Sequence, residues 1–427
     1  MFRSDSIFFI YFALLVLGPI IYIGKIPLAS YHLVFLLILT GALLIHLKTN
    51  KINLYFPVHL KVYFALLVLY LVTYVFNFYE MDYVAHFRDL IIIFAPIQYM
   101  VMVFLLCFIC QKEKEISNDY SFIFHRLIKL NLYLLPIIGI IAIFQMFDIF
   151  GSQEFLAKYY GKTNVAVWRQ YFMYNPRASA TLNLEPNSLG LYAAFSLVMF
   201  HVFYKEVRLG KITGMIIYFS GLLALMLSGS FTGFFIYILV STIYLFKYKK
   251  IGIKVVFFIS MITFVVSLIF ADNIDSALKR QKLDQGNIVP SSFKARLNNA
   301  WGKAFTSFEE EFVNGIGPSA IQLDYSADND FLDKFLRFGL IGGMANLFFV
   351  IFLMLYPLYK RIQDVSAFNR KLYFFAFLIA SCFALASITG SAFKAKRLAE
   401  IFWIFYSLPF IYTHLLNTPK VIANEKQ

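Results

Sequence analysis

Twelve apolar stretches follow one another along the 427-residue chain, and each is close to the length of a bilayer-spanning helix. A helix needs about 20 mostly apolar residues to cross a hydrocarbon core about 30 Å thick. Backbone polar groups cannot stay unpaired in lipid, so such stretches are expected to be helical. The predicted spans are residues 7–24, 30–47, 62–79, 89–110, 127–149, 187–204, 212–228, 231–247, 253–270, 331–357, 372–388 and 398–416. The sequence therefore predicts an all-α, polytopic integral membrane protein with about 12 transmembrane helices, forming one membrane domain over residues 1–427.

Composition agrees with this class. Hydrophobic residues make up 60% of the chain and charged residues only 15%, where soluble domains average about 25% charged residues. The formal net charge of +14 would suit a nucleic-acid binder only if the basic residues shared one soluble face. They fall between the apolar stretches instead, so no nucleic-acid partner is expected. The three cysteines lie inside apolar stretches, which argues against a zinc site or a disulfide framework.

The basic residues alternate along the chain. Cytoplasmic loops of membrane proteins carry an excess of Lys and Arg, and every second predicted loop is basic here. These loops contain Lys48, Lys51, Lys61, Lys112, Lys114, Arg126, Lys129, Lys205, Arg208, Lys211, Lys247, Lys249, Lys250, Lys254, Lys360, Arg361, Arg370 and Lys371. The alternation predicts an even number of spans with both termini cytoplasmic.

Two loops on the opposite, outer side are long, covering residues 151–186 and 271–329. Long loops are usually functional or disordered, and these contain aromatic residues and a helical pattern from Phe293 to Phe308, so we expect them to fold. The spans themselves contain almost no ionisable residue. Ion-coupled transporters place such residues near the membrane midplane, so an ion-coupled transporter is disfavoured.

The first motif runs from Arg177 to Pro186-Asn187, directly before a predicted span. Its structural interpretation is ordinary, because proline is common at the first position of a helix and asparagine at its N-cap. An interfacial arginine also often only extends toward lipid headgroups. The functional interpretation is an anion site, since a guanidinium beside a helix N-terminus can hold a diphosphate.

Two further motifs lie later in the chain. Arg296 and Trp301 belong to a predicted amphipathic surface helix, followed by Gly315 and Gly317. Asp328-Asn329 precedes another span, which carries Gly339 and Gly342. A solvated surface helix, an acidic helix start and close glycine packing explain these features equally well.

In their order along the chain and in the membrane side on which they are predicted to lie, these motifs resemble those of the O-antigen polymerase and O-antigen ligase superfamily of bacterial envelopes. The family pattern is an arginine before a Pro-Asn helix start, a Ser-rich turn, an outer-loop arginine helix with Gly-x-Gly, and a His-x-Asn or Asp-Asn helix start. The matching parts here are Arg177 with Pro186-Asn187, Ser228-Gly229-Ser230, Arg296 with Gly315 and Gly317, and Asp328-Asn329 with Gly339 and Gly342. The two spans that meet at the Ser-rich turn could alternatively form one broken or re-entrant region. The turn lacks the arginine common in relatives, since Phe231-Thr232 follows it.

The resemblance implies a GT-C-like glycosyltransferase that polymerises undecaprenyl-diphosphate-linked repeat units of O-antigen or capsular polysaccharide. The resemblance also implies a location in the bacterial inner membrane, with the long loops in the periplasm, no cofactor or metal, and a separate chain-length regulator as partner. On this basis Arg177, Arg296 and Asp328 are candidate catalytic residues. The candidate substrate-binding residues are Asn187, Arg169, Arg280, Asn329 and Glu185. Two alternatives stay open: an O-antigen ligase acting on lipid A-core, disfavoured because the last long loop lacks a histidine, and a flippase for lipid-linked oligosaccharide.

Overall fold

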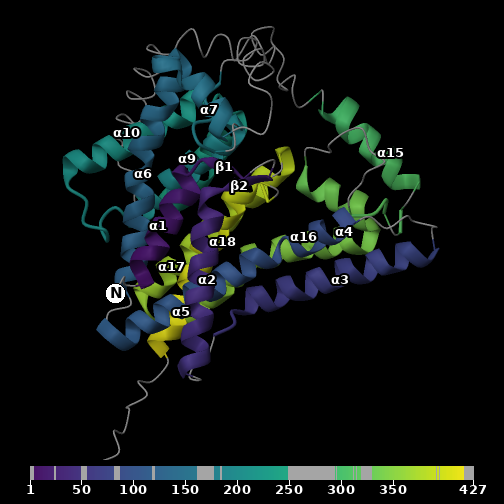
Figure 1. Cartoon of the computed structure of the whole chain (residues 1–427), viewed down its shortest axis with the longest axis horizontal. Helices are drawn as coiled ribbons and strands as arrows, with labels where there is room; N and C mark the ends of the chain where they lie inside the picture. Colours follow the sequence, from purple (N-terminus) through teal and green to yellow (C-terminus); the bar gives the residue numbers. More distant parts are fainter. Residues whose placement is uncertain are drawn as a thin grey trace, which may run out of the picture.

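The computed structural model is a bundle of helices with one small β-hairpin (Figure 1). It describes residues 4–23, 26–49, 55–80, 87–117, 121–160, 177–182, 185–248, 294, 296–310, 312–313, 315–318, 329–390, 392–393 and 395–417. The predicted span at 253–270 and most of the loop at 271–329 lie outside these ranges. The helices of the first half are α1 (Ser4–Leu17), α2 (Ser30–Thr49), α3 (Val58–Glu80), α4 (Phe87–Phe94), α5 (Ile97–Ser117), α6 (Ser121–Phe147) and α7 (Ser152–Tyr160). Those of the second half are α9 (Pro186–Phe203), α10 (Lys211–Leu227), α11 (Phe231–Tyr248), α15 (Gly302–Glu310), α16 (Asp330–Gln363), α17 (Ala367–Thr389) and α18 (Lys396–Asn417).

Seven segments among the described residues are long and apolar enough to cross a membrane. They lie in α3, α4–α5, α6, α9, α16, α17 and α18. Four shorter apolar helices, α1, α2, α10 and α11, coincide with four more predicted spans. The chain is thus a multi-pass α-helical membrane protein. The tight turn at Ser228-Gly229-Ser230 joins two separate helices, α10 and α11.

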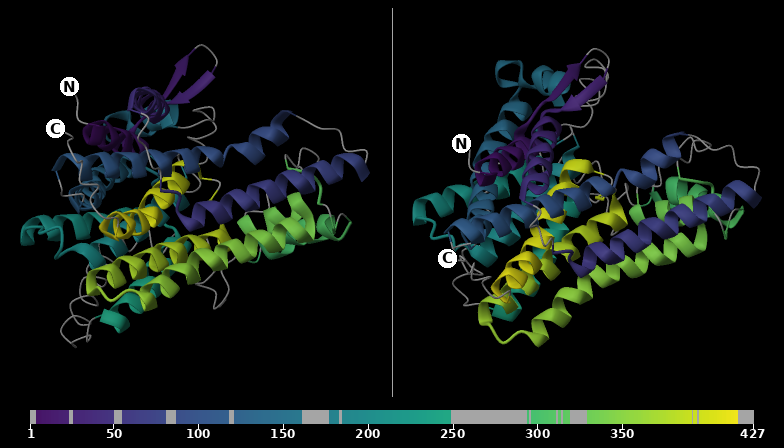
Figure 2. Two further views of the ribbon diagram at one scale, coloured as in Figure 1. Left: turned by 90° about the horizontal axis from the view of Figure 1, so that it is seen from below. Right: turned by 60° about the horizontal axis from the view of Figure 1, so that its bottom comes forward.

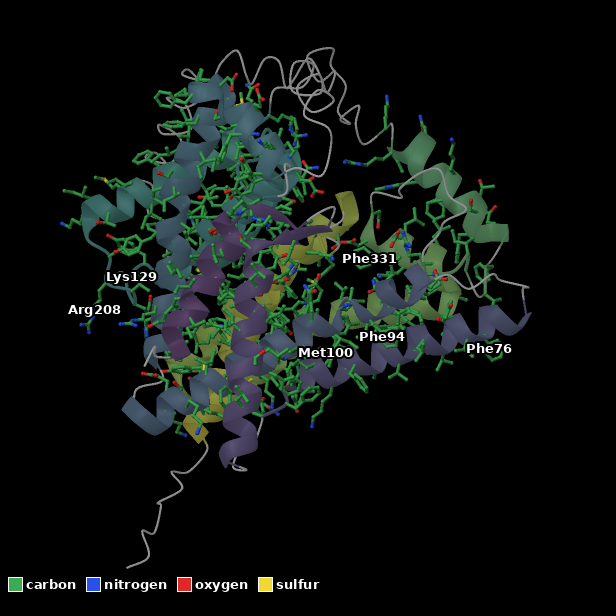
Figure 3. The ribbon with its side chains drawn as sticks, in the orientation of Figure 1. Phe76, Phe94, Met100, Lys129, Arg208 and Phe331 are labelled. Atoms are coloured by element: carbon green, nitrogen blue, oxygen red, sulfur yellow. The ribbon has the colours of Figure 1, made fainter. Side chains whose placement is uncertain are left out.

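The helix ends fall into two groups. At one end, Lys114 Nζ at the end of α5 donates to Leu415 O at the end of α18 (2.5 Å). At the same end, Lys371 of α17 pairs with Glu206, which follows α9. The opposite group includes the end of α1, the start of α5 and the start of α18, which are joined by contacts described below. Figure 3 shows Lys129 and Arg208 on one side of the molecule and Phe331, at the start of α16, on the other. We call the end of the bundle that contains the end of α1 and the starts of α5 and α18 the Arg397 end.

A β-hairpin at the Arg397 end was not predicted. The first span was expected to run to residue 24, but α1 ends at Leu17. Strands β1 (Ile20–Ile23) and β2 (Ile26–Ala29) then pair antiparallel, and Ser30 N donates to Pro19 O (3.0 Å). Pro19 disfavours helical backbone at the residue before it, and β-branched isoleucines favour strands. An apolar stretch alone does not distinguish a helix from a strand.

Proline also divides a predicted span. The stretch at 89–110 was expected to be one helix, whereas α4 and α5 are separate and meet at Ala95-Pro96. Pro96 has no N–H to donate, and its ring clashes with the preceding turn of a continuous helix. Helix α4 consequently lies against α3, and α3 and α16 run side by side away from the rest of the bundle (Figures 1 and 2).

Helix α16 is broken at Phe338-Gly339, where Gly339 has φ 62°. The backbone groups freed by the break bond to the segment that follows α15. Ile316 N donates to Leu336 O, and Leu340 N donates to Phe312 O, both at 2.9 Å. A Cβ on Gly315 would lie 2.4 Å from Gly339 N, so only glycine allows this approach. Such pairing is what makes a broken helix tolerable at membrane depth.

Candidate functional site

Arg177 lies at the Arg397 end, where three parts of the chain meet. Its Nε donates to Ser228 O (2.8 Å) and its Nη2 donates to Asn187 Oδ1 (2.7 Å). Ser228 belongs to the turn between α10 and α11, and Asn187 lies in the first turn of α9. The structure therefore brings together Arg177, the Pro-Asn helix start and the Ser-rich turn, which the sequence order had grouped.

Close backbone packing explains this meeting. A Cβ on Gly233 of α11 would lie 2.8 Å from Gly190 C of α9, and a Cβ on Gly190 would lie 2.5 Å from Ser230 Cβ. The two helices therefore approach closely, as small residues allow in membrane bundles. Ser230 Oγ accepts from Gly233 N (3.1 Å) at the start of α11. The turn thus lies directly against the N-terminal turn of α9.

Glu185 and Asn187 flank Pro186 at the start of α9, and both are exposed. The Glu185 carboxylate accepts a hydrogen bond from Ser188 Oγ (2.9 Å). Asn187 uses its side-chain oxygen for Arg177 rather than for capping α9, because Glu185 occupies the N-cap position. The helix N-terminus, with its partial positive charge, consequently lies beside the guanidinium.

Residues 177–182 form a non-helical segment, which is buried from residue 178 onward, and the side chain of Gln145 holds its backbone. Gln145 Oε1 accepts from Ser179 N and Ala180 N (both 2.8 Å), and Gln145 Nε2 donates to Ser179 Oγ (2.9 Å). Ala180 has φ 48°, a left-handed conformation that costs a non-glycine residue free energy. Gln145 is fully buried in α6. These contacts place Arg177 on a rigid support.

Arg397 connects this segment to α1 and α18. It is 2% exposed, and its Nη1 donates to Thr181 O (3.0 Å) while its Nη2 donates to Gly18 O (2.6 Å). Its guanidinium carbon lies 5.5 Å from the Tyr31 ring centroid and 5.9 Å from that of Tyr160. Burial raises the pKa of Tyr160 on α7, and the nearby Arg397 charge opposes that shift. The Arg397 guanidinium thus donates hydrogen bonds to one buried carbonyl after α1 and one before α9.

Glu400, one turn further along α18, forms a second buried network. Tyr11 Oη donates to Glu400 Oε2 and Gln98 Nε2 donates to Glu400 Oε1, both at 2.5 Å. Glu400 lies near the start of α18 and is only 2% exposed. Hydrogen bonds to a buried carboxylate offset its loss of hydration. The network therefore joins α1, α5 and α18.

The start of α16 carries the third motif. Asn329 caps the helix, with its Oδ1 accepting from Phe331 N (2.9 Å) and Leu332 N (3.1 Å). Asp330 Oδ2 accepts from Ser387 Oγ (3.0 Å) and Phe393 N (2.9 Å), which ties α16 to the connection between α17 and α18. Asp333 pairs with Arg337 Nε at 2.8 Å. Arg337 also donates to Pro318 O, in the segment that follows α15.

Arg296 lies in the short π-helix η3 (Arg296–Trp301), which continues into α15 as the predicted helix at Phe293 to Phe308 suggested. Trp301 packs with Leu332 and Leu336 of α16, and Figure 1 shows α15 above α16, away from α9. Arg296 is half-buried. Arg296 therefore lies in η3, whereas Arg177 lies in the non-helical segment that precedes α9.

Three of the candidate residues, Arg169, Arg280 and Asp328, lie outside the described residues. Three residues that the sequence did not single out make polar contacts that hold this part of the described structure together: Gln145, Arg397 and Arg337. Each is a polar residue in or next to an apolar stretch, and such residues in membrane helices mark function or polar packing. Their polarity within an apolar stretch was the one sequence signal that could have identified them.

The fold is that of a multi-pass α-helical membrane protein with a network of buried polar contacts at the Arg397 end. No protein-family model matches the sequence, and no curated protein matches it significantly.

Proposed function

We propose that this protein is a glycosyltransferase that polymerises undecaprenyl-diphosphate-linked oligosaccharide repeat units of O-antigen or capsular polysaccharide. The observation that carries the proposal is the fixed position of Arg177 between Ser228 and Asn187, beside the N-terminus of α9. Arginine beside a helix N-terminus is a fitting anion site. The proposal includes about 12 spans, a GT-C-like fold, cytoplasmic termini, and the Arg397 end at the periplasmic face of the inner membrane.

In the proposed reaction, a hydroxyl of the acceptor repeat unit attacks the anomeric carbon of the donor glycan. The bond from that carbon to the diphosphate oxygen breaks, the hydroxyl loses its proton, and undecaprenyl diphosphate leaves with the bonding electron pair. Negative charge grows on the diphosphate, and preorganised cations stabilise such charge. Arg177 is the proposed residue for this role, with Arg296 as the second candidate. Asp328 is the candidate acceptor of the proton.

A strain that lacks the gene tests the proposal, because the three candidate activities leave different products. Loss of a polymerase leaves lipid A-core capped with a single repeat unit. Loss of a ligase leaves bare core with accumulated lipid-linked polymer, and loss of a flippase leaves bare core without it. We expect single-repeat capping. If the product is capsule, the core carries no information and the lipid-linked intermediates are analysed directly. Either of the other two patterns would replace the proposal by the corresponding alternative.

A further inference from the structure

An exposed apolar stripe runs along α6, which contains one of the candidate membrane spans. Its members recur every three or four residues, which places them on one face of the helix. They are exposed by 37–68% and comprise Tyr133, Ile137, Ile140, Phe144 and Phe147. Contiguous exposed apolar surface of this kind marks contact with a membrane or another protein. In a multi-pass membrane protein, the stripe is the side of α6 that faces lipid.

The two ends of the stripe lie about one hydrocarbon thickness apart. Lys129 lies at the first end, with its Nζ 5.7 Å from the ring centroid of Tyr133. A lysine is unfavourable inside the hydrocarbon core, so it marks one boundary. At a rise of 1.5 Å per residue, α6 covers about 27 Å from Lys129 to Phe147, close to the roughly 30 Å of a hydrocarbon core. Phe147 therefore lies near the opposite boundary.

The chain turns at this boundary, and the turn presents a further aromatic side chain. Phe150 has φ 56° and is 94% exposed, and its ring centroid lies 6.2 Å from that of Phe144. Polar contacts hold the turn, since Gln153 N donates to Asp148 Oδ1 (2.9 Å) and Ser152 Oγ donates to Phe144 O (2.6 Å). A left-handed backbone is unfavourable for a bulky residue, and Phe150 adds little packing within the protein. The stripe thus continues past the end of α6.

Helix α7 follows this turn and lies against the end of α6 (Figure 1). Its inner face is buried and consists of Leu156, Ala157 and Tyr160. Phe155 and Tyr159 form a second, exposed face, with ring centroids 4.9 Å apart. Glu154 and Lys158 form a third face, which is exposed and charged. An aromatic face next to a charged face is typical of helices that lie in the interfacial region of a bilayer.

We propose that the turn at residues 148–151 and helix α7 form an interfacial anchor that lies in the lipid bilayer surface, with Phe147, Phe150 and Phe155 at the hydrocarbon boundary. Lipid, and not a second protein, is the partner because Phe150 contacts Phe144 of the lipid-facing stripe. The sequence assigned residues 151–160 to a long outer loop, whereas the anchor places them on the membrane.

The anchor also sets the depth of the candidate site. Gln145 lies on α6 between Phe144 and Phe147, and its side chain holds the backbone of the segment that begins at Arg177. Gln153 Nε2 of α7 donates to Gln145 O (3.0 Å). The anchor therefore fixes Arg177 close to the level of the lipid headgroups. The value of this depth for catalysis rests on the proposed function, whereas the membrane contact does not.

The test measures the depth of nitroxide labels on the purified full-length protein in phosphatidylcholine vesicles. One label is attached to Phe150→Cys and, in a second variant, to Phe155→Cys. The three native cysteines are buried and should react little, so the wild-type protein is the blank. Oxygen dissolves in hydrocarbon and a polar nickel chelate does not. The ratio of their collision rates with the label therefore reports lipid contact, and we expect it to be several-fold higher at both positions than at an aqueous site.

Two other exposed apolar positions calibrate this ratio. Ile140→Cys, in the middle of the stripe, should give the highest value. Val365→Cys is the matched control, because Val365 is 93% exposed but lies in the connection between α16 and α17, and its ratio should be about tenfold lower than at Ile140. Ratios at Phe150 and Phe155 equal to that at Val365 would overturn the proposal. Low collision rates with both reagents would also overturn it, since they indicate that protein covers these positions.

Folding and activity are separated from the readout. Phe150→Cys and Phe155→Cys replace exposed side chains, so their unfolding temperatures in detergent should equal that of the wild-type protein. The depth measurement needs no substrate. Failure of the proposed polymerase activity therefore leaves this test intact, and an aqueous position for both labels would contradict the anchor alone.

Discussion

Replacement of Arg177 by alanine is expected to reduce polymer formation by two to three orders of magnitude while the protein still reaches the membrane. Removing one preorganised donor to a developing negative charge typically has an effect of about this size. Arg177→Lys should recover little, because lysine lacks the planar, bidentate guanidinium. The measurement is the length distribution of the polysaccharide, together with the amount of protein in the membrane fraction.

Two controls distinguish a role in binding from a role in folding. Asn187→Ala removes the acceptor of the hydrogen bond from Arg177 Nη2 but leaves the bond from Arg177 Nε to Ser228 O, so it should lower activity less than Arg177→Ala does. Arg370→Ala removes an exposed arginine at the opposite end of the bundle and should have no effect. Polymer of normal length and amount in Arg177→Ala would eliminate the proposed anion site.

Replacement of Arg397 by methionine should have the largest effect on stability. The change leaves the buried carbonyls of Gly18 and Thr181 without their donor. Each unsatisfied buried group costs about 1–3 kcal/mol, so about 2–6 kcal/mol of folding free energy should be lost. Thermal unfolding in detergent is expected to shift strongly downward, and less protein should reach the membrane.

Two further variants, one conservative and one at the neighbouring position, serve as comparisons for Arg397→Met. Arg397→Lys keeps the positive charge but cannot reach both carbonyls in the same geometry, so it should fall between the wild-type protein and Arg397→Met. Lys396→Met affects the adjacent exposed position and should leave the unfolding temperature unchanged. Equal stability of Arg397→Met and the wild-type protein would show that the Arg397 end does not depend on this residue.

The sequence predicted most of the helices because apolar length and helix-start residues are local signals. The span predicted at 187–204 is α9 at Pro186–Phe203, and the one at 231–247 is α11 at Phe231–Tyr248. The hairpin at residues 20–29 and the break at Pro96 were missed. In both places the sequence stays apolar while the backbone stops being helical. The only local signals were Pro19 for the hairpin and Pro96 for the break.

The candidate site was predictable only in part. The motif order placed Arg177 shortly before the Pro186-Asn187 helix start, and Arg177 contacts Asn187 in the structure. Its contact with Ser228 was not predicted. The roles of Arg397 and Gln145 were not predictable, because their partners are mainly backbone groups that carry no sequence signal. Thr181 lies 216 residues from Arg397 along the chain, and Gly18 lies 379 residues from it. The close approach of Gly315 to Gly339 was not predictable either. Two glycines at separate positions in a sequence do not indicate that they pack against each other.

The most direct test of the account is reconstitution of the purified protein in vesicles with a defined undecaprenyl-diphosphate-linked repeat unit. We expect the glycan to lengthen in whole repeat units, with one undecaprenyl diphosphate released for each new linkage, and both products to be lost in Arg177→Ala. Transfer of the intact lipid-linked repeat unit across the bilayer, without lengthening and without release of undecaprenyl diphosphate, would contradict it.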